Sequence, residues 1–296
     1  MPGRRRDMFS GMMEKRTAYS LQETDTIWIR GCSQDIRFLH GSVQEELEVK
    51  EIMWADASGI QAQRRGSALC LYADRDKNSF FHRGHLAITE SEQIELKLPE
   101  AFKGQIYAET FSGDVYLIGL WDIKNLQMKT KSGDISVDCV RAEHILLECV
   151  SGDIDVEQAV GDLQLYSTSG DIYLKDGKGK LHGETVSGDI NVAGLVAKTI
   201  LGSKSGDIEA EFIKITDVVE TRNVSGDIEV AIAEGSCYTV AAKAVSGDVN
   251  VHIGGANIIS DNGHSCQARV GLDVTDNSPV VQISTVSGDI DVTGKY

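Results

Sequence analysis

The residues best placed to do chemistry are nine aspartates, each in a phrase of Ser-Gly-Asp, an apolar residue, a variable residue and a second apolar residue. They are Asp114, Asp134, Asp153, Asp171, Asp189, Asp207, Asp227, Asp248 and Asp289. A regular row of carboxylates could share calcium ions, which prefer oxygen ligands. Alternatively, each carboxylate could accept a hydrogen bond from a backbone amide where the chain bends.

Energetics favour the second interpretation. Stacked carboxylates would repel by about 0.9 kcal/mol per pair in water, whereas a charge-assisted bond to an amide contributes about 1.5–3 kcal/mol. The Gly-Gly-x-Gly-x-Asp pattern of calcium-binding nonapeptide repeats is absent from the sequence. We therefore expect a structural corner, in which glycine supplies positive φ. A calcium-binding acidic ridge remains the alternative, and no other cofactor is expected.

Other reactive side chains have plainer interpretations. His82 and His85 lie three residues apart but have no Cys or acidic companion at ligand spacing, so an exposed loop is expected there. The sequence contains no Cys-x-x-Cys pair, and we expect free thiols that act as small core residues. The cysteines are Cys32, Cys70, Cys139, Cys149, Cys237 and Cys266.

The second residue before each serine is small. This predicts a ladder of hydrogen-bonding side chains, as cross-strand Thr and Ser pairs form, and not a row of nucleophiles. The column comprises Thr110, Thr130, Cys149, Ser167, Thr185, Ser203, Asn223, Ala244 and Thr285.

An enzyme needs an asymmetric set of residues, whereas a repeat supplies the same residues at every level. The one segment with room for such a set is residues 254–279, which contains Asp261, His264, Arg269, Asp273 and Asp276. A lyase- or hydrolase-like site there is the alternative to a decayed repeat with a surface excursion, whose nearest remnant is Gly271-Leu272-Asp273-Val274. We expect no catalytic residues.

The spacing of the phrase predicts the elements that carry it. Successive serines are 18–21 residues apart except for a final gap of 41. In the phrase at residues 151–156, the apolar Ile154 and Val156 flank the polar Asp155, which is the inward and outward alternation of a strand. A further apolar position six residues before each serine indicates a second strand. The period is too short for a propeller blade and lacks the helices of ankyrin or tetratricopeptide units. The sequence therefore predicts an all-β chain, a parallel β-solenoid or β-helix of about ten 18–21-residue coils stacked about 4.8 Å apart.

The chain divides into three parts. Residues 1–22 include Arg4, Arg5, Arg6, Lys15 and Arg16, which predicts a basic flexible tail. Residues 23–105 carry alternating pairs without the phrase and are expected to form irregular first coils or a β cap. Residues 106–296 form the repeat solenoid, continuous with the cap.

Charge and hydropathy restrict partners and location. The net charge of −16 disfavours nucleic acid and anionic lipid as partners. The first 20 residues lack the apolar run of a secretory signal, and no 18-residue apolar stretch follows. We expect a cytoplasmic protein without a transmembrane segment, which could touch the inner face of the membrane only through its tail.

The phrase Val-Ser-Gly-Asp-Ile-x-Val at residues 150–156, 186–192, 224–230 and 286–292 resembles the signature of DUF4097 β-strand-repeat proteins, often labelled adhesins. The segments 94–99 and 104–114 also match the way that family enters its repeats, so the resemblance covers about residues 24–296. It implies a right-handed β-solenoid of bacterial, often envelope-associated proteins. Some of these are linked to envelope stress, and the resemblance provides no catalytic residues.

We therefore expect a non-catalytic scaffold or adhesin-like interaction protein. Its flat, repetitive faces suit a partner protein, a glycan or another copy of the chain. The last coil, residues 286–296, is expected to leave an uncovered end on which a second copy stacks. The alternative function is a carbohydrate-active lyase or hydrolase with its site in residues 254–279.

Overall fold

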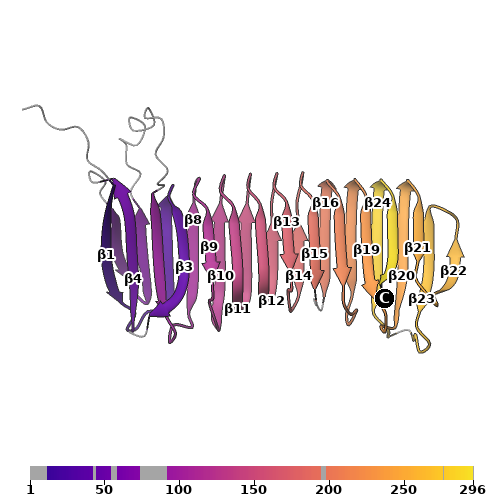
Figure 1. The fold of residues 1–296 in the computed structure, drawn as a ribbon, viewed down its shortest axis with the longest axis horizontal. Helices are drawn as coiled ribbons and strands as arrows, with labels where there is room; N and C mark the ends of the chain where they lie inside the picture. The colour runs from indigo at the N-terminus through magenta and orange to yellow at the C-terminus, as the bar shows by residue number, and fades with distance from the viewer. Residues whose placement is uncertain are drawn as a thin grey trace, which may run out of the picture.

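The structure is a computed structural model that describes residues 12–42, 45–54, 59–73, 92–194, 198–275 and 277–295. All regular elements in these segments are β-strands, which confirms the all-β prediction. No helix capable of crossing a membrane occurs in them. The strands stand side by side along one straight rod (Figure 1).

The strands that precede the corners form one long ladder, called here the entry face, which the hairpins β5–β6 and β22–β23 extend at its two ends. Neighbours in it are parallel except at β5–β6, β20–β23 and β23–β22, which are antiparallel. From the N-terminal end of the rod the order is β5 (Ile60–Arg65), β6 (Ala68–Ala73), β2 (Thr26–Cys32), β8 (Gln105–Thr110), β10 (Ile123–Thr130), the second halves of β11 (Ile135–Cys149) and β12 (Ile154–Tyr166), β14 (Leu181–Glu184), β16 (Thr199–Ser205), β18 (Val219–Ser225), β24 (Val280–Ser287), β20 (Tyr238–Ser246), β23 (Ser265–Val270) and β22 (Asn257–Asp261).

The strands that follow the corners form the exit face. Here only β1–β4 and β4–β7 are antiparallel. The order is β1 (Met12–Ser20), β4 (Glu46–Trp54), β7 (Gln93–Pro99), β3 (Asp35–Ser42), β9 (Val115–Ile118), the first halves of β11 and β12, β13 (Ile172–Lys175), β15 (Ile190–Gly194), β17 (Ile208–Phe212), β19 (Ile228–Ala233), β25 (Ile290–Lys295) and β21 (Val249–His252).

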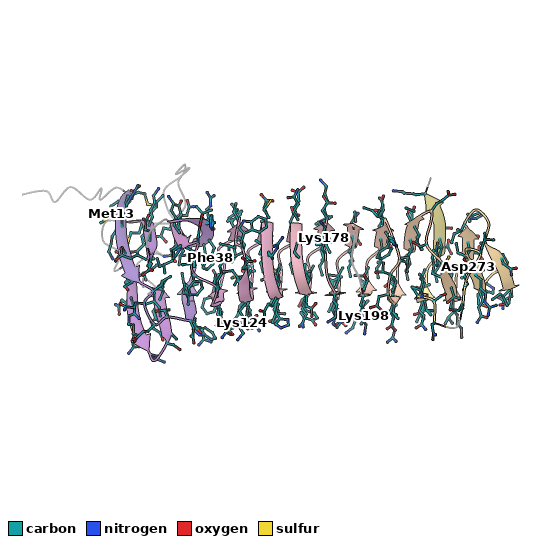
Figure 2. All side chains as sticks on the ribbon, turned by 90° about the horizontal axis from the view of Figure 1, so that it is seen from below. Met13, Phe38, Lys124, Lys178, Lys198 and Asp273 are labelled. Atoms are coloured by element: carbon teal, nitrogen blue, oxygen red, sulfur yellow. The ribbon has the colours of Figure 1, made fainter. Side chains whose placement is uncertain are left out.

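Equivalent residues of successive repeats lie directly on one another. Ile154 pairs in parallel with Ile172, which pairs with Ile190, and all three side chains are fully buried. β-Branched side chains suit such columns because they pack well on a pleated surface. The polar residues between them point outward, so that side chains surround the rod in rows (Figure 2).

At both ends the order in space differs from the order in the chain. The β2–β3 coil lies between β6–β7 and β8–β9. The last coil, β24–β25, lies between β18–β19 and β20–β21, so that β22 stands at the tip of the rod (Figure 1). The expectation of an uncovered last coil is therefore wrong.

The long gap in the repeat is not a decayed coil. Strands β22 and β23 form an antiparallel hairpin that extends the entry face beyond β20. An antiparallel neighbour needs only a short turn, whereas a further parallel coil would need a full circuit of the rod.

The N-terminal end is closed by antiparallel strands. Residues 12–20, which the sequence placed in a flexible tail, form β1, because their alternating side chains fit against β4. Lys15 points inward and pairs with the buried carboxylate of Glu51 at 3.2 Å. Arg4, Arg5 and Arg6 lie outside the described residues.

Candidate functional site

The aspartates of the corners form a continuous hydrogen-bonded row. In each coil the Asp backbone N–H donates to Oδ1 of the Asp in the neighbouring coil, over 2.7–3.1 Å. In spatial order the row is Asp35, Asp114, Asp134, Asp153, Asp171, Asp189, Asp207, Asp227, Asp289 and Asp248. The predicted carboxylate–amide bond is confirmed, and the amide belongs to the next coil. Hydrogen bonding between coils thus occupies one oxygen of each carboxylate from Asp35 to Asp289.

Two of the second oxygens also have partners. The hydroxyls of Tyr116 and Tyr173 donate to Oδ2 of Asp114 and Asp171, at 3.2 and 3.0 Å. The bond to Asp171 is the main reason that the pKa of Tyr173 is raised. No cluster of three or more potential metal ligands occurs in the described part of the chain. The calcium-binding alternative stays a prediction.

Asp35 is the one member of this row that was not among the nine predicted aspartates. It belongs to Ser33-Gln34-Asp35-Ile36, which follows the phrase except that Gln34 replaces the glycine. The alternation of Ile36 and Phe38 after it could have identified this copy. It lacks the glycine by which the other copies are identified.

Most corner glycines are required by close approach and not by φ. A Cβ on Gly133, Gly152, Gly170, Gly188 or Gly206 would lie 1.9–2.2 Å from the carbonyl oxygen of the glycine one coil below. Only the corners at Gly226, Gly247 and Gly288 combine this contact with positive φ, between 134° and 138°. Positive φ, which the sequence suggested as the role of these glycines, therefore applies at three of the nine corners.

The small side chains two residues before each serine point into the core from the entry face. They form a ladder of hydrogen bonds with the backbone of these glycines. Thr130 Oγ1 accepts the Gly133 N–H at 3.1 Å, and Cys149 Sγ accepts the Gly152 N–H at 2.9 Å and lies 3.2 Å from the Gly133 carbonyl. Burial raises the pKa of the Cys149 thiol, which disfavours the nucleophilic thiolate. The side chains form a hydrogen-bonded ladder, as the sequence predicted, and their partners are the backbone groups of the corner glycines.

The entry face carries two hollows of about 340 and 270 Å³ beside the corner. The first is lined by the residues three, two and one before the serines of successive coils, and the second by the same positions together with Ile200, Leu201 and Glu220. Tyr166 at the end of the first hollow pairs in register with Glu184 at the start of the second. We call this surface the axial groove. One wall comprises Glu109, Lys129, Glu148, Tyr166, Glu184, Gly202 and Arg222, and the other Lys131, Val150, Thr168, Lys204 and Val224.

The two walls differ in character. On the polar wall Lys129 and Glu148 form an ion pair at 2.5 Å. His182 joins Tyr166 to Glu184, with its Nδ1 3.3 Å from the Tyr166 hydroxyl and its Nε2 2.8 Å from the Glu184 carboxylate. On the other wall Val150 and Val224 are each about half exposed. The groove therefore offers hydrogen-bonding groups along one wall, and along the other it offers two half-exposed valines among the polar side chains of Lys131, Thr168 and Lys204.

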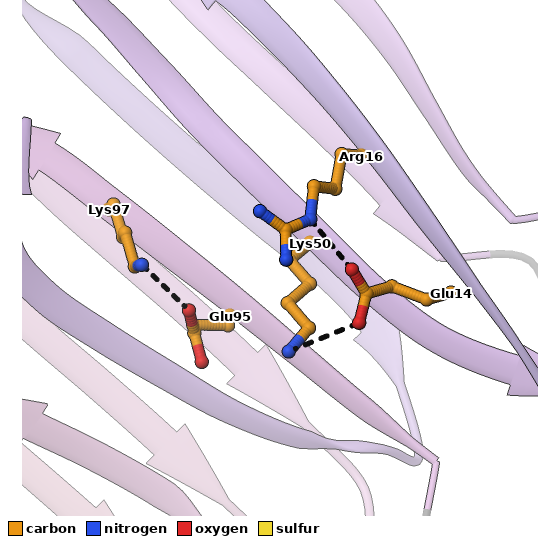
Figure 3. A network of polar contacts seen from close by, with 5 residues as sticks. All are labelled: Glu14, Arg16, Lys50, Glu95 and Lys97. Atoms are coloured by element: carbon orange, nitrogen blue, oxygen red, sulfur yellow. Dashed lines mark hydrogen bonds and ion pairs between the residues drawn. The ribbon is translucent and has the colours of Figure 1, made fainter.

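A second cleft, of about 300 Å³, lies on β1, β4 and β7. Glu14 accepts from Arg16 at 2.6 Å and pairs with Lys50 at 3.4 Å, and Glu95 pairs with Lys97 at 3.5 Å (Figure 3). The bond from Arg16 is the main reason that the pKa of Glu14 is lowered. Charges pair with one another here as they do in the axial groove, but the axial groove is the better candidate for a binding surface because the same positions line it in successive coils.

The described residues of the suggested enzyme site are spread over the terminal hairpin and the segment after β23. Asp261 and Arg269 stand at opposite ends of the β22–β23 pair, facing Cys266 and Asn257. Asp261 accepts the Gly263 N–H at 2.9 Å, and His264 Nδ1 lies 2.7 Å from the Gly247 carbonyl. Asp273 follows β23, while Asp276, His82 and His85 lie outside the described residues.

The five cysteines whose side chains are described have free thiols.

Comparisons with known proteins agree with this fold. The family model for Toastrack DUF4097 proteins matches residues 25–293. A search of curated proteins finds no match. A crystal structure of a putative adhesin from Parabacteroides merdae is 12% identical, covers 95% of each chain and superposes with a TM-score of 0.56. One from Bacteroides fragilis is 13% identical and covers 95% of this chain and 97% of its own, with a TM-score of 0.47.

Proposed function

The chain belongs to the Toastrack DUF4097 family, and we propose that it is a non-catalytic, adhesin-like binding rod whose axial groove recognises its ligand. The observation that carries the proposal is the repetition of the groove. Positions of the same three columns line it in one coil after another, and the parallel register stacks these coils directly. A ligand that follows the groove would meet the same positions of the coil, with side chains that vary from coil to coil, about every 4.8 Å.

We favour a linear glycan over an extended peptide as the ligand. A peptide strand advances about 3.3 Å per residue and would fall out of step with the coils. Sugar units present hydroxyls that both donate and accept, which suits the mixed polar wall, and their apolar ring faces suit Val150 and Val224. The net charge of −16 favours a neutral or amine-bearing glycan over an acidic one.

The experiment is a glycan array probed with the full chain, followed by binding measurements on two groove variants. Tyr166→Ala removes a side chain from the polar wall. Gly202→Lys fills the gap between Glu184 and Arg222, where a Cβ would meet nothing closer than 3.6 Å. We expect each substitution to weaken binding at least tenfold, which is about 1.4 kcal/mol. Tyr173→Ala is the matched control, because Tyr173 is exposed on the exit face.

Results of three kinds would contradict the proposal: no glycan bound, equal binding by the groove variants and the parent chain, or release of a cleaved product. Product release would favour the carbohydrate-active alternative and its site in residues 254–279. Binding of a protein in place of a glycan would be found by pull-down from the native cell and mass spectrometry. The same experiment tests the predicted cytoplasmic location and the link to envelope stress, through the compartment and identity of the captured proteins.

A further inference from the structure

The tip of the rod ends in an exposed strand. All five residues of β22 are exposed, and β23 is its only strand partner among the described residues. A register irregularity lies between Ile258 and Ser260. In a regular strand, one of the two neighbouring isoleucines would point towards the inner face of the hairpin. A β-bulge can redirect a side chain. Ile258 and Ile259 are both exposed, at 45% and 55%. The strand therefore presents a free edge with two apolar side chains.

The opposite end of the rod is protected. Strand β1 carries Glu14, Lys15 and Arg16, and β5 carries Arg64 and Arg65. Charged residues on an edge strand discourage pairing with another chain. In contrast, β22 has no Lys, Arg or Pro, and Asp261 at its end is its one charged residue. The two ends thus differ in the feature that controls edge pairing.

The sequence of β22, Asn-Ile-Ile-Ser-Asp, complements itself when two copies run antiparallel about Ile259. The isoleucines of the two copies then lie close together, and Asn257 of each copy faces Asp261 of the other as an amide donor opposite a carboxylate acceptor. We propose that the protein forms a two-fold dimer in which the two β22 strands pair and join the entry faces into one sheet. Because β22 is the last strand along the rod, the two bodies extend away from each other (Figure 1).

The isologous arrangement limits the assembly to a dimer, since the described part of each copy contains one such edge. It also determines how salt acts. Each chain has a net charge of −16, so the copies repel, and salt screens that repulsion. We expect the dimer to become stronger as ionic strength rises. This inference does not depend on what the axial groove binds.

The test is sedimentation velocity of the full chain over a concentration series at low and high salt. We expect a monomer–dimer equilibrium that the double substitution Ile258→Lys with Ile259→Lys weakens at least tenfold. The matched control is Ile118→Lys with Ile213→Lys, which adds the same charge at side chains 42% and 52% exposed and away from the tip. Gln63→Glu with Arg65→Glu on β5 should leave the dimer intact. Circular dichroism checks that each variant folds.

Each of four results would overturn the proposal. They are a parent chain that is monomeric at its highest soluble concentration, equal weakening by the control pair, assemblies that grow beyond a dimer, and loss of association on changing β5. The last result would show head-to-tail stacking.

Discussion

The backbone N–H of Asp248 donates to Oδ1 of Asp289 at 2.8 Å, although Asp289 comes 41 residues later in the chain. Asp289 in turn donates to Asp227, 62 residues earlier. The last coil is therefore inserted into the stack between two coils made before it. In a solenoid each coil contacts only its two neighbours. Because the last coil has a neighbour on both sides, the C-terminal segment is not at the end of the rod.

Removal of residues 288–296 tests this insertion. The deletion takes away β25 and the fully buried Ile290 and Val292, and it leaves the facing edges of β19 and β21 unpaired. Burial of one such side chain contributes about 1.5–3 kcal/mol, so we expect a loss of at least about 3 kcal/mol in urea unfolding. A loss below about 1 kcal/mol, as expected for a frayed terminal coil, would contradict the inserted position.

Glycine-to-alanine substitutions test close approach at the corner. In Gly152→Ala the new Cβ would lie 2.2 Å from the Gly133 carbonyl oxygen, and the coils must separate to admit it. We expect destabilisation of about 1–3 kcal/mol, the usual range for overpacking. Gly202→Ala is the control, since the nearest atom would be 3.6 Å away. Equal unfolding midpoints for the two variants would show that the corner has room.

Two buried threonines offer a stabilising change. Thr199 and Thr221 are fully buried, and their hydroxyls have no hydrogen-bond partner among the described residues. Valine has a similar shape and removes the cost of the unpaired hydroxyl, so Thr199→Val and Thr221→Val should each stabilise the fold by about 1 kcal/mol. Thr185→Val should act in the opposite direction, because Thr185 Oγ1 donates to the Gly170 carbonyl at 3.2 Å. Thermal melts of the three variants decide the signs.

Tyr238 predicts alkaline sensitivity. Burial raises the pKa of its phenol to about 12, because the buried phenolate is poorly solvated. The folded chain then holds a proton that the unfolded chain releases near pH 10. The contribution is complete below about pH 10 and is lost as pH rises towards 12, at about 1.4 kcal/mol per pH unit. Unfolding of Tyr238→Phe between these pH values should show a shallower decline than that of the parent chain. Parallel declines would contradict the assignment to Tyr238.

Much of the fold follows from periodicity. The repeated phrase and its alternation identify Ile154, Ile172 and Ile190 as equivalent inward residues, and the structure stacks them. The same repetition predicts that the aspartates bond to backbone amides. These features are local or repeat at a constant interval, so a single chain read in order is enough to find them.

Features that depend on which coils are neighbours required the tertiary structure. A coil makes the same parallel hydrogen bonds whichever neighbour it meets, so periodicity cannot place Asp289 between Asp227 and Asp248. The axial groove became visible only when residues about one period apart, such as Tyr166 and Glu184, were seen to line one surface. The sequence alone determined which residues are equivalent and which way they point. The tertiary structure decided the order of the coils, because that order is a relation between distant segments that leaves no periodic trace.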